Sequence, residues 1–204
     1  MVDSNYWDEK YSVDEFVYTK LENRFVVEYC SDLVGSRAID LAGGEGRNSV
    51  WLAKKGWQVE NIDFSEVALD KYLKYAQEEQ VAGHCTATCQ DAVTFSPQST
   101  PVDLGVIAYL QINQNDLQLA IRRLAQHIAP GGHLFGVWHS RDNLEGGFGG
   151  PRDPEVLPNV ATITQALEGT GLEIMELKNR DGQIQTREGL KPSVTLVLLA
   201  KRPE

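Results

Sequence analysis

Apolar segments recur along the chain, and more polar segments separate them. Seven of these segments are strand candidates, and several of them are rich in Val, Ile and Leu without a clean alternation of apolar and polar residues. That pattern is typical of strands whose two faces are both buried. The strand candidates are residues 37–42, 57–63, 84–90, 102–110, 132–138, 171–178 and 193–202.

Helical patterns lie between several of the strand candidates. They cover residues 46–55, 65–79 and 115–128. Ser65 is a candidate N-cap, and the run from Pro130 to Gly132 predicts a helix end. Strands that alternate with helices predict a parallel sheet with helices on both faces, joined by right-handed crossovers. Residues 181–192, which separate the last two strands, have a weak helical signal, so a hairpin there would make the final strand antiparallel.

Two segments fall outside this alternation. In residues 13–34 apolar side chains recur at mixed spacings of three and four residues, which predicts an amphipathic helix or a helix pair that could cover a site. Residues 140–159 are rich in glycine and proline and are the least regular part of the chain. A loop of that length inside a compact domain favours a lid or binding loop, the alternative being a disordered excursion.

Length and composition indicate one soluble α/β domain. A chain of 204 residues, 42% hydrophobic and 24% charged, can bury a core without help from a disulfide. We expect a single domain over residues 1–204, with residues 1–35 as a helical cap and residues 36–204 as the core. The formal net charge of −10 argues against a nucleic-acid partner, because proteins that neutralise phosphates usually carry clustered Lys and Arg.

Cysteine content and hydropathy favour a cytoplasmic protein. Cys30, Cys85 and Cys89 form an odd number in a chain that needs no disulfide, which favours a reducing compartment. The N-terminal residues lack an apolar run of signal-peptide length, and no apolar stretch is long enough to span a membrane. We expect no membrane contact, and either a monomer or a homodimer.

Residues 38–56 join an apolar strand, a glycine turn and an amphipathic helix. Gly44 and Gly46 permit a tight turn and a close approach of a ligand to the backbone, and the helix start adds free N–H groups. A dinucleotide fingerprint would place a third glycine or alanine where Ser49 stands. Asp40 lies inside the strand before the turn, where its carboxylate would repel a pyrophosphate and attract a cation.

Two further carboxylates follow the next strands. Asp63 ends the second strand candidate, where an acidic side chain can accept hydrogen bonds from both hydroxyls of a ribose. Asp91 ends the third, within reach of an adenine amino group in such a fold. Together with Asp40 they indicate a site for an adenosine that carries positive charge. The alternative is that they are turn and cap residues, since Asp is common at strand ends.

These motifs resemble those of a known family. The chain is similar to the class I S-adenosylmethionine-dependent methyltransferases, and among them to small tellurite-resistance-like stand-alone enzymes. The glycine motif with its downstream Asp63 is highly specific, whereas the outer pieces indicate only the subgroup. The matching pieces, which follow the family's order, are residues 6–12, 38–69, 89–92, 102–112, 129–138 and 149–159.

The resemblance implies a fold, a cofactor and its contacts. The implied fold is a Rossmann-like, doubly wound α/β sheet of seven strands, mostly parallel with the last strand antiparallel, and with an N-terminal helical cap. The implied cofactor is S-adenosyl-L-methionine, with its methionine part and ribose on the glycine loop. The implied cofactor contacts are Asp40, Ala42, Gly43, Gly44, Gly46, Arg47, Asn48, Asp63, Phe64, Asp91, Ala92 and Tyr109.

Some of these positions have distinct roles in the family. By resemblance, Arg47 and Asn48 would meet the methionine carboxylate, and Tyr109 would stand near the methyl sulfonium. Ala42 stands where the family usually has its first glycine, which is a small intrusion that should leave cofactor binding intact. Gln111 stands where relatives often have His, which weakens the case for a general base at that position.

The acceptor side of the reaction has its own candidates. Methyl transfer from a sulfonium has a neutral leaving group, so the protein mainly aligns the nucleophile and excludes water. A thiol, selenide or telluride needs little more, whereas an alcohol or amine often needs a base. His139 is the best candidate base and Arg141 the best anion contact, with Tyr109 as a third catalytic candidate; the alternative roles of His139 and Arg141 are structural or solvated.

The N-terminal segment supplies the candidate acceptor contacts. Its aromatic rings could close over the sulfonium or an apolar substrate. The alternative is that a helix packs these rings on the core. The candidate substrate-binding residues are Tyr6, Trp7, Tyr11, Tyr18 and Arg24.

Other chemistries have less support. His84, Cys85 and Cys89 form an incomplete ligand set, and on a strand the two cysteines share one face, which suits core packing, so we expect no metal. The chain has no nucleophile-elbow or phosphate-loop motif. The sequence therefore predicts an enzyme that methylates a small molecule such as a thiol or a chalcogen oxyanion. The alternatives are a non-catalytic S-adenosylmethionine-binding module and, with less support, a nicotinamide-dependent oxidoreductase.

Overall fold

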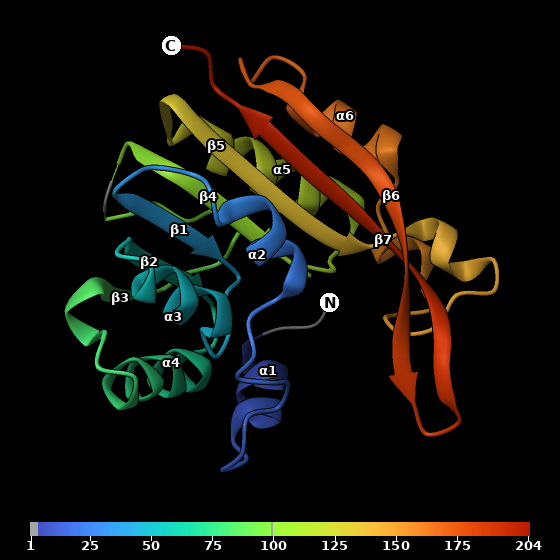
Figure 1. The fold of residues 1–204 in the computed structure, drawn as a ribbon, viewed down its shortest axis with the longest axis horizontal. Coiled ribbons are helices and arrows are strands. Elements are labelled where there is room, and N and C mark those ends of the chain that lie inside the picture. Colours follow the sequence, from blue (N-terminus) through green and yellow to red (C-terminus); the bar gives the residue numbers. More distant parts are fainter. Residues whose placement is uncertain (1–3, 99) are drawn as a thin grey trace.

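A seven-stranded sheet forms the centre of the molecule, with strand order β3-β2-β1-β4-β5-β7-β6 (Figure 1). The structure is a computed structural model, and it describes residues 4–98 and 100–204. Residues 1–3, which belong to the expected cap, lie outside the described residues. The strands are β1 (Arg37–Leu41), β2 (Gln58–Asp63), β3 (Cys85–Cys89), β4 (Val102–Ala108), β5 (Ile128–His139), β6 (Glu173–Thr186) and β7 (Gly189–Lys201).

The direction of the strands confirms the expected fold class. Strands β1 to β5 pair in parallel, and β7 is antiparallel to both of its neighbours, β5 and β6. The chain builds outward from β1 to β3 and then returns to the other side of β1 with β4. Ligands of doubly wound sheets bind at such a reversal, beyond the carboxyl ends of the strands.

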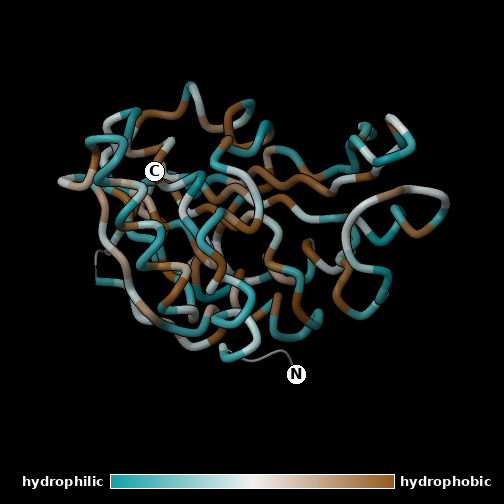
Figure 2. The backbone as a smooth tube through the Cα atoms, turned by 90° about the horizontal axis from the view of Figure 1, so that it is seen from below, coloured by the Kyte–Doolittle hydropathy of each residue, from teal (hydrophilic) through white to brown (hydrophobic). Residues whose placement is uncertain are grey.

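Helices cover both faces of the sheet. Helices α2, α3 and α4 belong to one apolar cluster, and α5 and α6 to the cluster on the other face. Figure 2 shows apolar segments gathered in the middle of the molecule and polar segments at its periphery. The α-helices are α1 (Ser4–Tyr11), α2 (Arg24–Cys30), α3 (Arg47–Lys54), α4 (Glu66–Glu78), α5 (Gln114–Gln126) and α6 (Val160–Leu167), and the short 3₁₀ turns are η1 (Ala82–His84), η2 (Arg141–Leu144) and η3 (Pro154–Val156).

Side-chain caps define where several helices begin. Asn23, Ser65, Asn113 and Asn159 each accept a hydrogen bond from a backbone N–H in the first turn of α2, α4, α5 and α6, respectively. A cap of this kind typically contributes about 1 kcal/mol of helix stability. The prediction of Ser65 as an N-cap is confirmed.

The N-terminal segment differs from the prediction for residues 13–34. Helices occupy Ser4–Tyr11 and Arg24–Cys30, and the described chain between them has no helix. The apolar side chain of Phe16 meets the Tyr75 ring edge-on, with 5.3 Å between centroids. The Val17 N–H donates to the Glu45 carboxylate instead of to a helical carbonyl. Tertiary contacts therefore replace the helix that the spacing predicts.

Three other predictions need correction. The helix predicted for residues 115–128 ends earlier, at Gln126, and β5 already begins at Ile128. Gly131 has a φ of 76°, and its N–H donates to Arg202 O, so it lies within the strand instead of ending the helix. Helix α6 (Val160–Leu167) had no counterpart among the predicted helices. Cys85 is buried, but Cys89 is exposed at the end of β3, so only the first of the two packs in the core.

Strands β6 and β7 form a hairpin that extends beyond the rest of the sheet (Figure 1). Strand β7 pairs with β5 up to Thr195, opposite His139, and pairs with β6 as far as Gly189. The hairpin between the last two strands is therefore confirmed, and most of residues 181–192, expected as the connection, is itself strand.

The irregular loop of residues 140–159 packs on the projecting part of this hairpin. Phe148 N–H donates to Pro192 O at 2.8 Å, and Val194 N–H donates to Asn143 Oδ1 at 2.7 Å. These bonds place the loop next to the carboxyl end of β5. The loop and the hairpin thus rise together from the edge of the sheet at which ligands are expected.

Candidate functional site

The loop between β1 and α3 turns through left-handed backbone conformations. The φ angle is 57° at Ala42, 54° at Gly44 and 81° at Gly46. The Gly46 N–H closes the turn on the Gly43 carbonyl at 3.0 Å. Gly46 is also the N-cap of α3, and it supplies no side-chain hydrogen bond to the helix. The start of α3 thus lacks a side-chain cap from Gly46, and a polar ligand group could bind backbone N–H groups there.

Two tyrosines explain why glycine occupies positions 44 and 46. A Cβ on Gly46 would lie 2.1 Å from the Tyr72 ring, and a Cβ on Gly44 would lie 2.9 Å from the Tyr11 hydroxyl. Tyr72 is fully buried in the core, whereas Tyr11 ends α1. The loop is therefore packed against both the core and the N-terminal segment, and a side chain at either glycine would disturb it.

Asp40 and Asn61 lie beside the loop on neighbouring strands and are both inaccessible to solvent. The Ser49 hydroxyl donates to Asp40 Oδ2 at 2.7 Å, and Asn61 Nδ2 donates to Gly44 O at 3.1 Å. The Oδ1 atoms of Asp40 and Asn61 have no partner among the described residues. Burial raises the pKa of Asp40 from 3.8 to about 6, against the opposing effect of the Ser49 bond.

Asp63 ties the glycine loop to the end of β2. Its Oδ2 accepts from Gly44 N–H at 2.9 Å, and its Oδ1 accepts from Ser65 N–H at 3.0 Å. The side chain is buried, and this burial raises the pKa of the carboxyl, while the backbone N–H donors oppose the shift. Asp63 thus shares one small region with the loop, as the ribose role requires.

The predicted adenine contacts lie at the end of β3. Asp91 follows this strand, is exposed, and accepts from Val93 N–H at 2.6 Å. Ala92 is half-buried against the apolar core, and Phe64 is half-buried next to Asp63. Strands β2 and β3 pair up to Asp63 and Cys89, so the predicted ribose and adenine residues follow adjacent strand ends.

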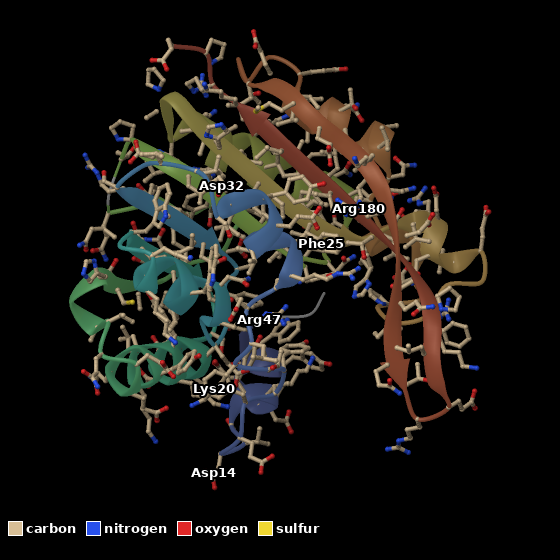
Figure 3. The ribbon with its side chains drawn as sticks, viewed as in Figure 1. Asp14, Lys20, Phe25, Asp32, Arg47 and Arg180 are labelled. Atoms are coloured by element: carbon tan, nitrogen blue, oxygen red, sulfur yellow. The ribbon has the colours of Figure 1, made fainter. Side chains whose placement is uncertain are left out.

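Arg47 and Asn48 begin α3 and differ in their surroundings. Asn48 is buried, and its Oδ1 accepts from Asn23 N–H at 2.9 Å, which anchors the start of α2 on α3. Arg47 is half-buried; burial raises the pKa of Asp40 and of Tyr11, and the Arg47 charge partly offsets both increases. Arg47 lies between α1 and α2 (Figure 3).

Tyr109 and His139 lie together at the carboxyl ends of β4 and β5. Their ring centroids are 4.8 Å apart, and Tyr109 has a φ of 62°. Burial lowers the pKa of His139, and its Nδ1 has no partner among the described residues. Gln111 accepts from His139 N–H at 2.8 Å and donates to Val156 O at 2.7 Å, so it fixes the backbone around the histidine.

Arg141 is held within the irregular loop. Its Nη2 donates to Pro154 O at 2.8 Å, and its Nε is buried without a partner among the described residues. Gly150 packs against the His139 ring, since a Cβ there would lie 2.4 Å from the ring. The loop therefore covers His139, and Arg141 helps to hold the loop in place.

The four N-terminal aromatic residues do not act as one group. Tyr6 meets Trp7 edge-on, and Trp7 stacks on Tyr11 with 5.6 Å between centroids. Of the four, Tyr11 is buried, against the glycine loop, whereas Tyr6 and Tyr18 are more than half exposed. Lys10 lies over Trp7 and donates to the Tyr18 hydroxyl at 2.8 Å. The stack of Trp7 on Tyr11 is the part that reaches the loop.

Arg24 begins α2 and extends toward the hairpin. Its guanidinium lies over Phe25, 4.5 Å from the ring centroid, and a Cβ on Gly182 would lie 2.5 Å from its Nη2. Arg180 of β6 approaches the same ring but is paired with Glu28 at 2.8 Å (Figure 3). Arg24 has no acidic partner within ion-pair distance in residues 4–98 and 100–204.

Sequence reasoning missed three residues around the loop. Asn61 was detectable, because an amide in an apolar strand beside Asp40 needs a reason to be buried. Glu45 and Lys71 pair at 2.6 Å across the loop, but charged residues in a loop and on a helix are ordinary surface residues in a sequence pattern. Their pairing depends on the path of the N-terminal segment, which the sequence pattern did not predict.

The described residues contain no group of three or more His, Cys, Asp or Glu side chains that could hold a metal ion. Within the same residues, no helix has the length and apolar character needed to cross a membrane.

Part of the chain matches a known family of protein domains. Residues 38–132 match a family model described as "Methyltransferase domain". This segment contains the glycine loop, Asp63, Asp91 and Tyr109. No curated protein sequence matches the chain. The prediction of a methyltransferase is confirmed at the level of this domain.

Solved structures give the same fold. TehB from Haemophilus influenzae has a TM-score of 0.71 at 18% identity, over 98% of this chain and 66% of that chain. An S-adenosylmethionine-dependent methyltransferase from Clostridium acetobutylicum has a TM-score of 0.67 at 18% identity, over 98% of both chains. Magnesium protoporphyrin IX methyltransferase from Synechocystis PCC 6803, with bound SAM, has a TM-score of 0.62 at 21% identity, over 86% and 74%. At these identities the likeness shows the fold alone.

Proposed function

We propose that this chain transfers a methyl group from S-adenosyl-L-methionine to a small-molecule acceptor. The observation that carries the proposal is the turn between β1 and α3, with its open helix start and its bond from Gly44 N–H to Asp63. Such a loop offers backbone N–H groups to the methionine part of the cofactor, while a carboxylate beside it can bind a ribose. The domain match over residues 38–132 supports the same chemistry.

The cofactor would contact three strand ends. The glycine loop with Asp40 would hold the methionine part, Asp63 the ribose, and Asp91 the adenine. Arg47, with no partner carboxylate within ion-pair distance in the described residues, is the cation best suited to the methionine carboxylate. The remaining proposed contacts are Ala42, Gly43, Gly44, Gly46, Asn48, Phe64, Ala92 and Tyr109.

The acceptor would enter between the N-terminal segment, the irregular loop and the hairpin. His139 is the proposed general base, because the neutral form that its lowered pKa favours can take a proton at a ring nitrogen. Arg24 is the proposed contact for a negatively charged group of the acceptor. Of the other acceptor candidates, Trp7 and Tyr11 reach the loop, whereas Tyr6, Tyr18 and Arg141 have weaker support.

The acceptor class and cellular setting are also proposals. Likeness in fold to magnesium protoporphyrin IX methyltransferase makes small molecules the first class to test, and the motifs of the sequence add tellurite-like oxyanions to that class. We infer one methyltransferase domain, with residues 1–35 as its cap. The free cysteines fit a cytoplasmic protein. We propose that it works as a monomer or a homodimer.

Calorimetric titration with S-adenosylhomocysteine tests the cofactor site. We expect binding by the native chain and a loss of about tenfold or more in Asp63→Asn, because the carboxylate would lose charge-assisted hydrogen bonds to the ribose. Asp32→Asn, a change at an exposed acid on the far side of α2, should bind like the native chain. Folded native protein that releases no heat would refute the proposal.

A turnover screen tests the transfer. Release of S-adenosylhomocysteine is measured with pooled thiols, amines, phenols and oxyanions, tellurite included. Turnover that falls sharply in His139→Asn is expected for acceptors that must lose a proton. Cofactor binding without turnover of any pool would favour a non-catalytic binding module.

A further inference from the structure

Glu45 occupies an unusual position for a charged residue. It stands between Gly44 and Gly46, and its side chain is 5% exposed. Its Oε1 pairs with Lys71 Nζ of α4 at 2.6 Å. A carboxylate that is buried this far needs such a partner, because its desolvation costs more free energy than a single weak contact provides. The glycine loop is thus joined to α4 by an ion pair.

Lys71 also holds the N-terminal segment. Its Nζ donates to the carbonyls of Tyr11, Val13 and Glu15, at 3.3, 3.0 and 2.6 Å. One ammonium therefore binds the carbonyls of every second residue from the end of α1 to Glu15. An ammonium has three N–H donors, so these three carbonyls and Glu45 together leave none of its N–H groups without an acceptor.

Glu45 completes the attachment from the loop side. Both of its carboxylate oxygens accept from Val17 N–H at 3.1 Å. The segment from Tyr11 to Val17 is therefore bound at its start by Lys71 and at its end by Glu45. These bonds take the place of the helix expected there.

A second attachment lies on the ribose side of the proposed site. Asp8 Oδ1 of α1 accepts from the Ser65 hydroxyl at 2.6 Å, while Ser65 N–H donates to Asp63 at 3.0 Å. The N-terminal segment is thus connected to both pieces that would hold the cofactor, the glycine loop and the end of β2. Between these two attachments, the Tyr11 hydroxyl meets Gly44.

The Lys71 side of the ion pair is accessible from solvent, whereas Glu45 is buried. Lys71 lines a surface hollow of about 480 Å³ between the N-terminal segment and α4. Phe16, Lys74 and Tyr75 also line it. The attachment therefore lies at the surface, on the side of α4 that faces the N-terminal segment.

We propose that Glu45 and Lys71 form a clasp that closes the N-terminal segment, residues 4–17, over the bound cofactor and sets its rate of release. The proposal rests on the proposed function, since it needs a ligand on the glycine loop. Glu45 and Lys71 are positioning residues in this scheme, because they act through Tyr11 and the segment. A ligand under the segment leaves only after the clasp has opened.

The test measures the dissociation rate of S-adenosylhomocysteine by stopped-flow displacement. In Lys71→Met the rate constant should rise about tenfold or more, because the three carbonyls and Glu45 lose their donor. Amide exchange of residues 12–17 should slow when the native chain binds S-adenosylhomocysteine, and this protection should be lost in the variant. Lys74→Met, which changes another lysine of the same hollow, should leave both readouts unchanged.

A second variant guards against a simple loss of folding. Glu45→Gln keeps an oxygen for Val17 N–H but removes the ion pair, so it should speed release in the same direction. Folded Lys71→Met and Glu45→Gln with native release rates would overturn the clasp and leave the proposed function standing. A native chain that binds no S-adenosylhomocysteine would overturn both proposals.

Discussion

At the scale of the residue, Ala42 has a strained backbone conformation. Its φ of 57° is a conformation in which a Cβ crowds the following carbonyl. Ala42→Gly should therefore raise the free energy of unfolding by up to about 1 kcal/mol, measured by urea denaturation. Ala53→Gly, inside α3, should instead lower it by about 1 kcal/mol or more, because glycine weakens a helix. A lower stability in Ala42→Gly would contradict the strain argument.

Asp40 predicts a pH dependence with a definite sign. Its pKa of about 6 in the folded chain exceeds the ordinary 3.8, so the folded state binds the proton more tightly. The contribution of Asp40 to stability is therefore greatest below pH 4 and is lost as the pH rises through about 6. A shift of about two pKa units corresponds to roughly 3 kcal/mol.

Asp40→Asn isolates this effect. From urea unfolding at pH 4, 5, 6 and 7, the stability of the variant relative to the native chain should rise between pH 4 and 6 and then level off. Other carboxylates titrate in both proteins, so their effects cancel in the difference. A difference that stays constant with pH would show that Asp40 titrates normally in the folded protein.

The residues of the site differ in how far a sequence can predict them. Asp40, Gly44 and Asp63 follow from strand ends and a glycine turn, which are local patterns. The structure brings these three together, with the Gly44 N–H on Asp63. The role of Lys71 depends on a contact between α4 and a segment some sixty positions earlier. No local sequence pattern predicts that contact.

At the scale of the element, β5 depends on a glycine for its largest side chain. A Cβ on Gly136 would lie 2.0 Å from the Trp138 ring, which is fully buried two positions along the same strand. Gly136→Ala should lower the free energy of unfolding by about 1–3 kcal/mol, since the indole must move in a packed core. Gly83→Ala, where the added methyl meets nothing within 4 Å, is the matched control and should have little effect. Equal unfolding midpoints for the two variants would refute this role for Gly136.

Elements with a strong internal pattern were predictable, and those held by tertiary contacts were not. Strands β1, β2 and β4 follow from apolar runs, and α4 follows from its cap at Ser65 and its apolar face. The chain around Phe16 has helical spacing but lies against Tyr75 and Glu45 without a helix. The spacing shows which side chains are apolar, but the residues that bury those side chains determine the backbone conformation.

At the scale of the whole molecule, we expect the projecting hairpin to be separable from the side of the sheet that carries the glycine loop. Replacing residues 183–192 by Asn-Gly would join Gly182 to Ser193, a native pair, through a tight turn. The pairing of β7 with β5 lies outside the deletion. We expect calorimetry to show native binding of S-adenosylhomocysteine, and the turnover screen to show a large loss of acceptor methylation.

The deletion also removes Pro192, which binds the irregular loop. Gln185→Ala, a change on the hairpin that leaves its backbone intact, serves as the control and should keep activity. Loss of cofactor binding in the shortened chain would contradict the separation of the two sides.

The position of β7 has a consequence for synthesis on the ribosome. The last strand to emerge lies between β5 and β6, so β6 cannot join the sheet while it is the end of the nascent chain. Until β7 arrives, β5 presents an unpaired edge, which is a template for association with other chains. Premature termination before Gly189 should therefore yield aggregates, although nearly all residues of the glycine-loop half would be present.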